Sequence, residues 1–377
     1  MSDLADHPYR ETHHNLRKIY IEPTCRCNLA CRTCMRNEWD EPLGDMAWPV
    51  FERILDAVRR CAPRPVVFFG GYGEPFCHAR ILEMIAAMKQ AGAWVEAITN
   101  GTLLSEKTIE ALVEIGLDWL WVSIDDPHQE SFQGARSDGG GNPVLGSLDQ
   151  LRSLRMRLSS PGPELGISFV ATRQTIAKLP AIYEVGRRLG VKTVHVSHLL
   201  PHTPEMAEDI LYPWYYNNQG ERSGQTRPLV SLPYWEMDCR GIPMYARMDL
   251  AGPGWDRPRQ VPARQCPFLA KGSISVRWDG AVSPCIPLLH THPTYLEDRR
   301  RVNMAYAFGR LPEEDLLALW ASPEAVGLRE RLIDFSFSPC VECNSCEMAT
   351  HNREDCFGNL HPTCGGCLWA RGLIQCP

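Results

Sequence analysis

Three closely spaced cysteines constrain this chain more than any other feature of its sequence. Cys27, Cys31 and Cys34 have the spacing C-x3-C-x2-C and follow directly after a segment with the pattern of a β-strand. Iron–sulfur cubanes normally take four cysteine thiolates, so a group of three leaves one iron open to a small molecule. The spacing therefore predicts a cluster with one open iron at the end of the first strand.

A zinc site is the alternative interpretation of these cysteines. C-x2-C pairs are common zinc ligands, but zinc prefers four tetrahedral ligands and no second pair lies nearby in the sequence. Cys25 could serve as a fourth ligand only with awkward geometry, because a C-x-C spacing separates it from Cys27. We interpret Cys25 as a bystander and favour the iron–sulfur cluster.

The cysteine loop resembles that of radical S-adenosylmethionine (SAM) enzymes, including Asn28 and Leu29 after the first cysteine. The resemblance implies a 4Fe-4S cluster on Cys27, Cys31 and Cys34, whose open iron binds the amino and carboxylate groups of SAM. It also implies that reduction of the cluster cleaves SAM to methionine and a 5′-deoxyadenosyl radical, which abstracts hydrogen from a C–H bond. In such enzymes the cofactors perform the difficult chemistry and the protein supplies placement.

Composition favours a metal or redox protein. The chain has 377 residues, enough for two domains, and a formal net charge of −6, which predicts no global attraction to nucleic acid or to anionic membranes. It has neither a signal-peptide pattern nor an apolar run of about 18 residues, so we expect a cytoplasmic protein. Because the cytosol keeps thiols reduced, its 16 cysteines favour metal or redox chemistry over disulfides.

Six short β-branched or aromatic runs alternate with helical patterns between residues 16 and 200. This alternation is typical of βα units around a parallel sheet. The expected fold class is α/β, and the resemblance implies a laterally open, partial (β/α)6 barrel. The expected strands are 18–22, 65–69, 94–99, 119–124, 165–171 and 193–198.

Residues that follow the expected strands are candidates for binding SAM. Glycines allow a ligand to approach the backbone, and polar side chains at successive strand ends converge on one mouth of a barrel. The resemblance implies that the glycine-rich stretch after the second strand binds the methionine end of SAM. Each polar residue could instead begin a turn or pack in the core, and Asp126 replaces a glycine that family members often have. The candidates are Gly70, Gly71, Gly73, Glu74 and Pro75 after the second strand, and Thr99, Asn100, Ser123, Asp125, Ser168, Ser197 and His198 at later strand ends.

Nine further cysteines lie between Cys266 and Cys376, beginning with Cys266-x13-Gly280-x4-Cys285. This pattern resembles the SPASM extension, which in relatives binds two auxiliary 4Fe-4S clusters. Nine thiols are one more than two four-ligand clusters need, and the spacing C-x2-C-x2-C departs from the C-x2-C-x5-C-x3-C that is common in relatives. Which cysteine binds which cluster therefore stays open. One zinc site in place of a cluster also stays open. The candidate ligands are Cys266, Cys285, Cys340, Cys343, Cys346, Cys356, Cys364, Cys367 and Cys376.

These patterns predict four parts of the chain. They are an N-terminal extension (1–15), the barrel (16–200), a connection rich in Pro, Tyr, Trp and Gly (201–262) and a cysteine-rich SPASM region (263–377). Within the last part we expect a β-hairpin over 273–283 with an Asp-Gly turn, and a short helix over 313–320.

The last residues carry a narrower resemblance, to radical SAM/SPASM maturases of tungsten-containing aldehyde oxidoreductases. It implies a cofactor or small molecule as substrate, and we expect reduced flavodoxin or ferredoxin as electron donor and neither nucleic acid nor membrane as partner. The residues that carry it are Asp355-Cys356-Phe357-Gly358-Asn359, Cys364-Gly365-Gly366-Cys367, Cys376-Pro377 and Arg277-Trp278-Asp279-Gly280.

Three other functions stay open. Epimerisation or dehydrogenation at a secondary alcohol of a sugar-like metabolite would suit Cys239, which lies outside both cysteine groups and is a tentative hydrogen donor. A buried, inert thiol is the simpler interpretation of Cys239. Peptide modification is possible in principle, but only about 15 residues precede the first expected strand, leaving little room for leader-peptide recognition. A non-enzymatic iron–sulfur or zinc scaffold would explain the tail but not the SAM-type motifs.

Overall fold

Six parallel strands form the centre of the structure, which confirms the expected α/β class. Each expected strand end lies within one residue of the observed end, and β1 to β6 pair in parallel in chain order. The computed structural model describes residues 15–127, 143–160, 162–211, 248–249, 266–296, 299–343 and 346–377. The strands are β1 Lys18–Ile21, β2 Val66–Phe69, β3 Val95–Thr99, β4 Trp119–Ser123, β5 Glu164–Ala171 and β6 Thr193–His198.

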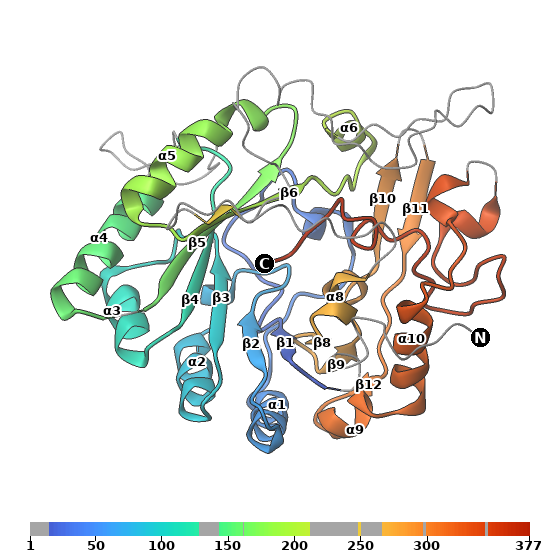
Figure 1. The fold of residues 1–377 in the computed structure, drawn as a ribbon, viewed down its shortest axis with the longest axis horizontal. Helices are drawn as coiled ribbons and strands as arrows, with labels where there is room; N and C mark the ends of the chain where they lie inside the picture. The colour runs from blue at the N-terminus through green and yellow to red at the C-terminus, as the bar shows by residue number, and fades with distance from the viewer. Residues whose placement is uncertain are drawn as a thin grey trace.

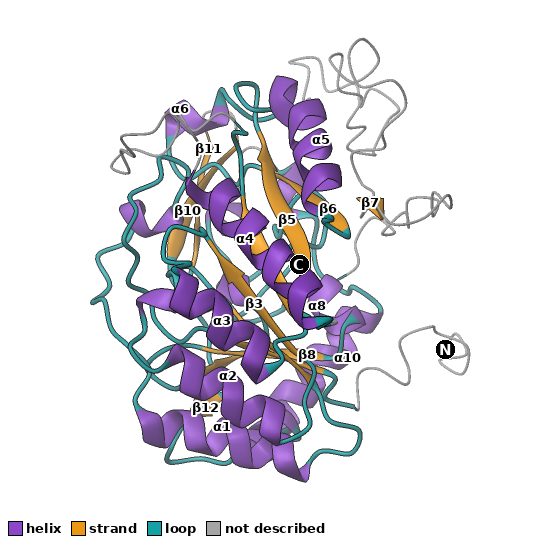
Figure 2. Cartoon of the chain, turned by 90° about the vertical axis from the view of Figure 1, so that its left-hand side faces the viewer, coloured by secondary structure: helices purple, strands orange, loops and turns teal. Residues whose placement is uncertain are grey.

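Helices between these strands cover the outer face of the curved sheet (Figures 1 and 2). In α3, Ser105 caps the N-terminus by accepting a hydrogen bond from Thr108 N at 3.2 Å, and Gly116 ends the helix with a φ of +74°. Among the described helices, none is long and apolar enough to span a bilayer. The five helices that follow β1 to β5 are α1 Trp48–Arg60, α2 Ile81–Gln90, α3 Glu106–Ile115, α4 Pro143–Leu158 and α5 Leu179–Leu189.

The cysteine-rich region extends the same sheet past β1. Strand β8 (Ser273–Val276) pairs in parallel with β1, and β9 (Ala281–Ser283) pairs with β8 in the expected hairpin. β12 (Gly309–Arg310) continues this edge beyond β9, and β7 (Met248–Asp249) pairs with β6 at the other edge. The barrel sheet and the SPASM region therefore share backbone hydrogen bonds along β1 (Figure 1).

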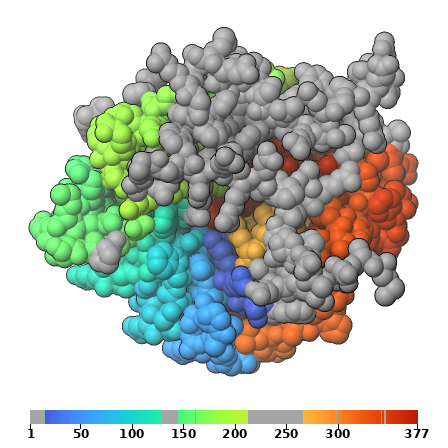
Figure 3. Space-filling model, in the orientation of Figure 1, coloured from blue at the N-terminus to red at the C-terminus, as the bar shows by residue number. Residues whose placement is uncertain are grey.

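The remaining elements surround this edge. The expected helix over 313–320 is shorter than predicted, because Asp315 caps α9 by accepting a hydrogen bond from Ala318 N at 2.9 Å. Figure 3 shows the barrel helices, blue to green, and the C-terminal region, orange to red, on opposite sides of this view. The elements are α6 Pro204–Ala207, α8 Pro267–Ala270, α9 Leu316–Trp320, α10 Pro323–Ile333 and the antiparallel pair β10 His292–Leu296 and β11 Arg299–Asn303.

Successive side chains of a strand point to opposite faces of the sheet, so the buried residues form two clusters. Ile19 and Ile21 point toward the helices and join the larger cluster, whereas Tyr20 between them joins the other. This inner cluster also contains Trp121 and residues near the C-terminus such as Leu368. The inner face of the sheet thus packs against the cysteine-rich region, and the last residues lie inside the arc of strands (Figure 1).

Candidate active site

The cysteine loop is closed at its base by hydrogen bonds. Thr24 and Asp45 form an isolated β-bridge, and Thr24 Oγ1 donates to Asp45 Oδ1 at 2.6 Å. Inside this closure, Gly44 N donates to the sulfur of Cys25 at 3.1 Å, and Cys25 is buried. Cys25 thus has a structural contact in the loop base, apart from the three thiols of the motif.

Cys27, Cys31 and Cys34 influence one another electrostatically. Burial raises the pKa of Cys31 to about 11, and the neighbouring charges of Cys34 and Cys27 contribute to the rise. The sulfur of Cys27 accepts hydrogen bonds from Leu29 N at 3.3 Å and from Asn100 Nδ2 at 3.7 Å. Such donors suit a thiolate ligand, since hydrogen bonds to sulfur are part of what tunes a cluster.

Arg36 provides a test of whether this loop fits an anionic cofactor. Its Nε and Nη1 atoms are buried and have no hydrogen-bond partner among the described residues. Its positive charge acts to lower the pKa of Cys31 and of Cys34, although burial raises both pKa values overall. Because buried donors are normally paired, these two unpaired donors beside thiols fit a bound anion such as a thiolate cluster.

The glycine stretch packs against the cysteine loop. A Cβ atom on Gly73 would lie 2.1 Å from the carbonyl oxygen of Thr24, and Glu74 N donates to Arg26 O at 2.8 Å. Gly71 has a φ of +128°, and a Cβ there would lie 2.7 Å from Glu22 Cγ. The lack of a side chain at Gly71 and Gly73 therefore lets Glu22 and the backbone of Thr24 approach the glycine stretch closely. That the same stretch also binds SAM stays a prediction.

Glu74 joins the glycine stretch to the end of β3. Its carboxylate accepts hydrogen bonds from Thr99 Oγ1 at 2.8 Å, Asn100 N at 2.7 Å and Phe76 N at 3.1 Å. Burial raises the pKa of Glu74, while these hydrogen bonds oppose the rise. Asn100 Nδ2 also donates to Asn28 Oδ1 at 3.0 Å, so these predicted residues form one connected group with the cysteine loop.

The candidates on β4 and β5 lie side by side. Ser123 and Ser168 are register partners, but Ser168 is not at a strand end as expected, because β5 continues to Ala171. Asp125 accepts a hydrogen bond from Val170 N at 2.7 Å, and burial raises its pKa to about 6. Asp126, at the position where relatives often have glycine, is buried and forms an ion pair with Lys178.

The two candidates on β6 have different surroundings. Ser197 Oγ accepts a hydrogen bond from Gln375 N at 3.0 Å, which ties the strand to the cysteine-rich tail. Burial lowers the pKa of His198 to about 4, so its imidazole is neutral at pH 7. Cys239, the tentative hydrogen donor, lies outside the described residues.

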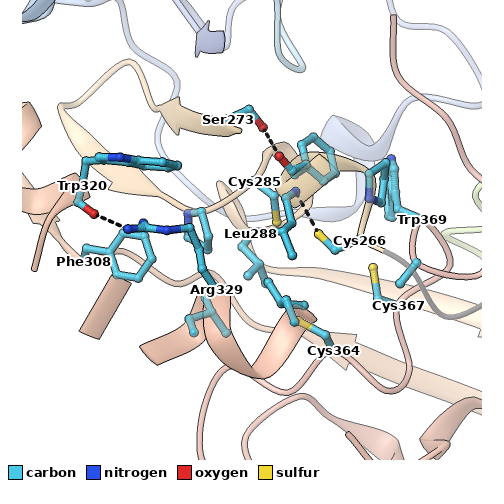
Figure 4. A pocket seen from close by; sticks show the side chains of 17 residues that line it. Cys266, Ser273, Cys285, Leu288, Phe308, Trp320, Arg329, Cys364, Cys367 and Trp369 are labelled. Carbon is cyan, nitrogen blue, oxygen red and sulfur yellow. Dashed lines mark hydrogen bonds between the residues drawn. The ribbon is translucent and has the colours of Figure 1, made fainter. Parts of the chain in front are cut away.

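Four tail cysteines line one cavity. Figure 4 shows their sulfur atoms around a common space that is otherwise lined mainly by apolar side chains. Burial raises the pKa of Cys285 well above its usual value, and the charges of the other three cysteines raise it further. This group, called cysteine group A below, comprises Cys266, Cys285, Cys364 and Cys367.

A second set of four cysteines gathers around Cys343. Burial raises the pKa of Cys343, and the charges of Cys340, Cys346 and Cys356 add to the rise; these four are called cysteine group B. Cys346 and Cys356 are exposed, which places group B near the surface. Cys376, the ninth tail cysteine, instead accepts a hydrogen bond from Trp369 Nε1 at 3.2 Å. Within the described part of the chain, no three His, Cys, Asp or Glu side chains meet closely enough to hold a single metal ion.

Sequence reasoning missed several residues around the site. Cys77 lies beside the cysteine loop, with its sulfur 4.0 Å from Asn28 Oδ1, and Arg36 has the unpaired donors described above. His290 contacts both Glu22 and Glu41 across a long sequence separation. Only Cys77 had a signal in the sequence, since it closely follows the glycine stretch.

Comparisons with known proteins agree with this geometry. A family model described as the radical SAM superfamily matches residues 21–211, and one described as SPASM, an iron-sulfur cluster-binding domain, matches residues 266–347. The "tungsten-containing aldehyde ferredoxin oxidoreductase cofactor-modifying protein" of Pyrococcus furiosus is 28% identical over 370 residues, covering 96% of this chain and 97% of the relative. An "AdoMet-dependent heme synthase" of Methanosarcina barkeri is 26% identical over 232 residues, covering 59% of this chain and 64% of the relative.

Two solved structures show the same fold at low sequence identity. "Native anSMEcpe with bound AdoMet" aligns with a TM-score of 0.53 at 16% identity, covering 94% of this chain and 95% of that one. Streptococcus suis SuiB bound to the precursor peptide SuiA aligns with a TM-score of 0.55 at 15% identity, covering 88% and 71%. The chain therefore belongs to the radical SAM superfamily, as an enzyme with a C-terminal SPASM domain.

Proposed function

We propose that this enzyme binds a 4Fe-4S cluster through Cys27, Cys31 and Cys34 and cleaves SAM reductively at that site. The observation that carries the proposal is the group of three mutually interacting thiols at the end of β1, beside the unpaired donors of Arg36. When bound, the cluster would supply the electron that converts SAM to methionine and a hydrogen-abstracting 5′-deoxyadenosyl radical.

The chain's own residues prepare this site in two ways. Leu29 N and Asn100 Nδ2 donate to the sulfur of Cys27, which stabilises it as a thiolate ligand. Glu74 fixes the glycine stretch to the end of β3, so the backbone that would face the methionine end of SAM is held in place. Asp125 and the neutral His198 are the candidates for contacts with the ribose or the substrate.

We propose that cysteine groups A and B bind two auxiliary 4Fe-4S clusters. Two sets of four thiols match the four ligands that each cubane takes, and Cys376, paired with Trp369, is left over. The buried, apolar surroundings of group A and the exposed thiols of group B would give the two clusters different solvent access. Solvent access is one factor that sets cluster potential, so the pair suits an electron route between surface and interior.

For the substrate, we propose the cofactor, or a cofactor precursor, of a tungsten-containing oxidoreductase. The support is the relative from Pyrococcus furiosus, whose similarity extends over 96% of this chain, including both cysteine regions. The tail motifs around Cys356 and Cys364 support it independently of the barrel. Cys239, the candidate hydrogen donor of the epimerase alternative, lies outside the described part of the structure.

The test of the chemistry compares cluster content with SAM cleavage. Anaerobically reconstituted wild type should hold about 12 irons per chain and form 5′-deoxyadenosine when dithionite is added. Replacing Cys27, Cys31 and Cys34 together by Ala should leave about eight irons and abolish 5′-deoxyadenosine. Cys61→Ala, which removes a thiol at the end of α1, is the matched control and should behave as wild type. SAM cleavage by the triple variant would refute the site.

The test of the substrate uses a tungsten oxidoreductase produced without this enzyme. Incubation with reconstituted enzyme, SAM and reductant should change the mass of the cofactor extracted from that oxidoreductase and raise its activity. The triple cysteine variant is the negative control. An unchanged cofactor, in a reaction that still cleaves SAM, would leave the radical chemistry intact and reject this substrate.

A further inference from the structure

His290 is a buried ion outside both cysteine groups. Its side chain has no exposed surface, and its ring nitrogens lie 2.8 Å from Glu22 Oε2 and 2.7 Å from Glu41 Oε2. Ionised carboxylates only accept hydrogen bonds, so with both glutamates ionised each ring nitrogen carries a proton. Burial lowers the pKa of His290, but the hydrogen bonds and charges of Glu22 and Glu41 raise it to about 9. His290 is therefore an imidazolium between two carboxylates.

The two carboxylates contact the two loops of the candidate active site. Glu41 lies in the cysteine loop, within the closure at Asp45, whereas Glu22 follows β1 directly. The second oxygen of Glu22 accepts a hydrogen bond from Tyr72 N, in the glycine stretch, at 3.0 Å. One ring from the SPASM region thus reaches the cysteine loop on one side and the glycine stretch on the other.

Other contacts from the SPASM region converge on the same part of the cysteine loop. Thr291 N donates to Glu41 Oε1 at 3.0 Å, and Arg277 Nη1 donates to Glu41 Oε2 at 3.1 Å. A Cβ atom on Gly44 would lie 2.1 Å from the ring of Trp278, so the loop is pressed against the hairpin turn. Among the described residues, the hydrogen-bond partners of the Glu41 carboxylate are therefore Arg277, His290 and Thr291.

Aromatic rings enclose the imidazolium. The Trp39 ring lies 4.0 Å from the His290 ring, and the Tyr72 ring meets it edge-on at 5.7 Å. Tyr72 OH donates to Ile286 O at 3.4 Å, next to Cys285 of group A. Ion pairs that are buried and hydrogen-bonded on all sides hold their geometry tightly, because breaking one leaves a charge unpaired in the interior.

We propose that His290, a residue of the SPASM region, is a positioning residue for SAM. It fixes the position of the cysteine loop relative to the glycine stretch. The inference rests on the proposed SAM chemistry, in which one loop carries the cluster and the other the methionine end of SAM. A ligand that must contact both loops binds best when their separation is fixed. Neither Glu22 nor Glu41 can hold the other without the cation between them.

The test measures SAM affinity in the reconstituted full chain. SAM is titrated by calorimetry into the reconstituted enzyme without reductant, so that it binds without being cleaved, and the titration gives Kd. His290→Gln, which can donate to only one carboxylate, should raise Kd by about 10–100-fold, because a small misplacement of the groups that position a ligand is costly. Iron content and the signals of the auxiliary clusters should stay at wild-type values.

Further variants keep the inference testable if His290→Gln folds poorly. Glu41→Ala removes only the loop end of the link, leaves His290 paired with Glu22, and should also raise Kd. Glu41→Gln retains an acceptor for Thr291 N and should lose less affinity than Glu41→Ala. Arg60→Gln is the matched control, since it breaks a different ion pair to the C-terminal region, with Asp315, far from both loops, and should bind SAM as wild type.

The possible results separate the two proposals. Wild-type SAM affinity in both His290→Gln and Glu41→Ala would overturn the positioning role while leaving the proposed function intact. Loss of iron from these variants, with unchanged affinity in the chains that keep the barrel cluster, would also overturn it. Failure of the wild type itself to bind SAM would reject the proposed function and this inference with it.

Discussion

At the scale of single residues, the carboxylate of Glu74 holds the end of β2 to the end of β3. It accepts hydrogen bonds from Thr99 Oγ1 at 2.8 Å and Asn100 N at 2.7 Å. Glutamine would turn one acceptor into a donor, so Glu74→Gln should lower the free energy of unfolding by roughly 1–3 kcal/mol. Chemical denaturation measures this, with Glu83→Gln, at an exposed carboxylate of α2, expected to behave as wild type. Equal losses in both variants would contradict the role of Glu74.

Site residues could be predicted where the chemistry requires a fixed spacing along the sequence. They could not be predicted where only the tertiary structure brings them together. Cys27, Cys31 and Cys34 share one loop, so their spacing identified the loop. Glu22, Glu41 and His290 are separated by up to 268 residues, and only the tertiary structure brings them into contact. The division of tail cysteines into groups A and B was likewise open, because C-x2-C-x2-C is compatible with several allotments and Cys364 is brought to Cys266 by the fold.

At the scale of elements, the glycine stretch and the cysteine loop are packed backbone against backbone at Gly73. Because a Cβ there would lie 2.1 Å from Thr24 O, Gly73→Ala must push the two loops apart. We expect this variant to lose iron from the barrel cluster, falling from about 12 to about eight irons per chain. Iron analysis after reconstitution measures it. Gly146→Ala, in the first turn of α4 with open space around it, should retain all the iron; retention by Gly73→Ala would refute the packing argument.

The strands β1 to β6 were predictable because each is a short, buried run bounded by turn residues, and parallel neighbours follow in chain order. The pairing of β8 with β1 was not predictable, because it joins segments more than 250 residues apart and nothing local specifies the partner. The helix α9 was overextended in the prediction because Glu313 and Glu314 suit a helix, whereas Asp315 is the cap that begins it.

At the scale of the whole molecule, two of the contacts that join the SPASM region to the barrel differ in their response to pH. The first is the backbone pairing of β8 with β1, and the second is the contact of His290 with Glu22 and Glu41. The backbone pairing does not depend on pH in the neutral range, whereas the imidazolium does. The charge network also includes Arg277, which lies beside Glu41. We therefore expect the contact between the two regions to weaken as the pH rises.

The sign of this sensitivity follows from the pKa of His290, which the two carboxylates raise from 6.5 to about 9. A raised pKa in the folded state contributes stability that is complete below pH 6.5 and is lost as the pH rises through 9. The free energy of unfolding should thus fall by on the order of a few kcal/mol over this range, at up to about 1.4 kcal/mol per pH unit. Urea unfolding of wild type and His290→Gln at both ends of the range measures it, and the variant corrects for other groups that titrate there, cysteines included. The wild type should lose more stability than the variant, and parallel losses would show that His290 is not charged in the folded protein.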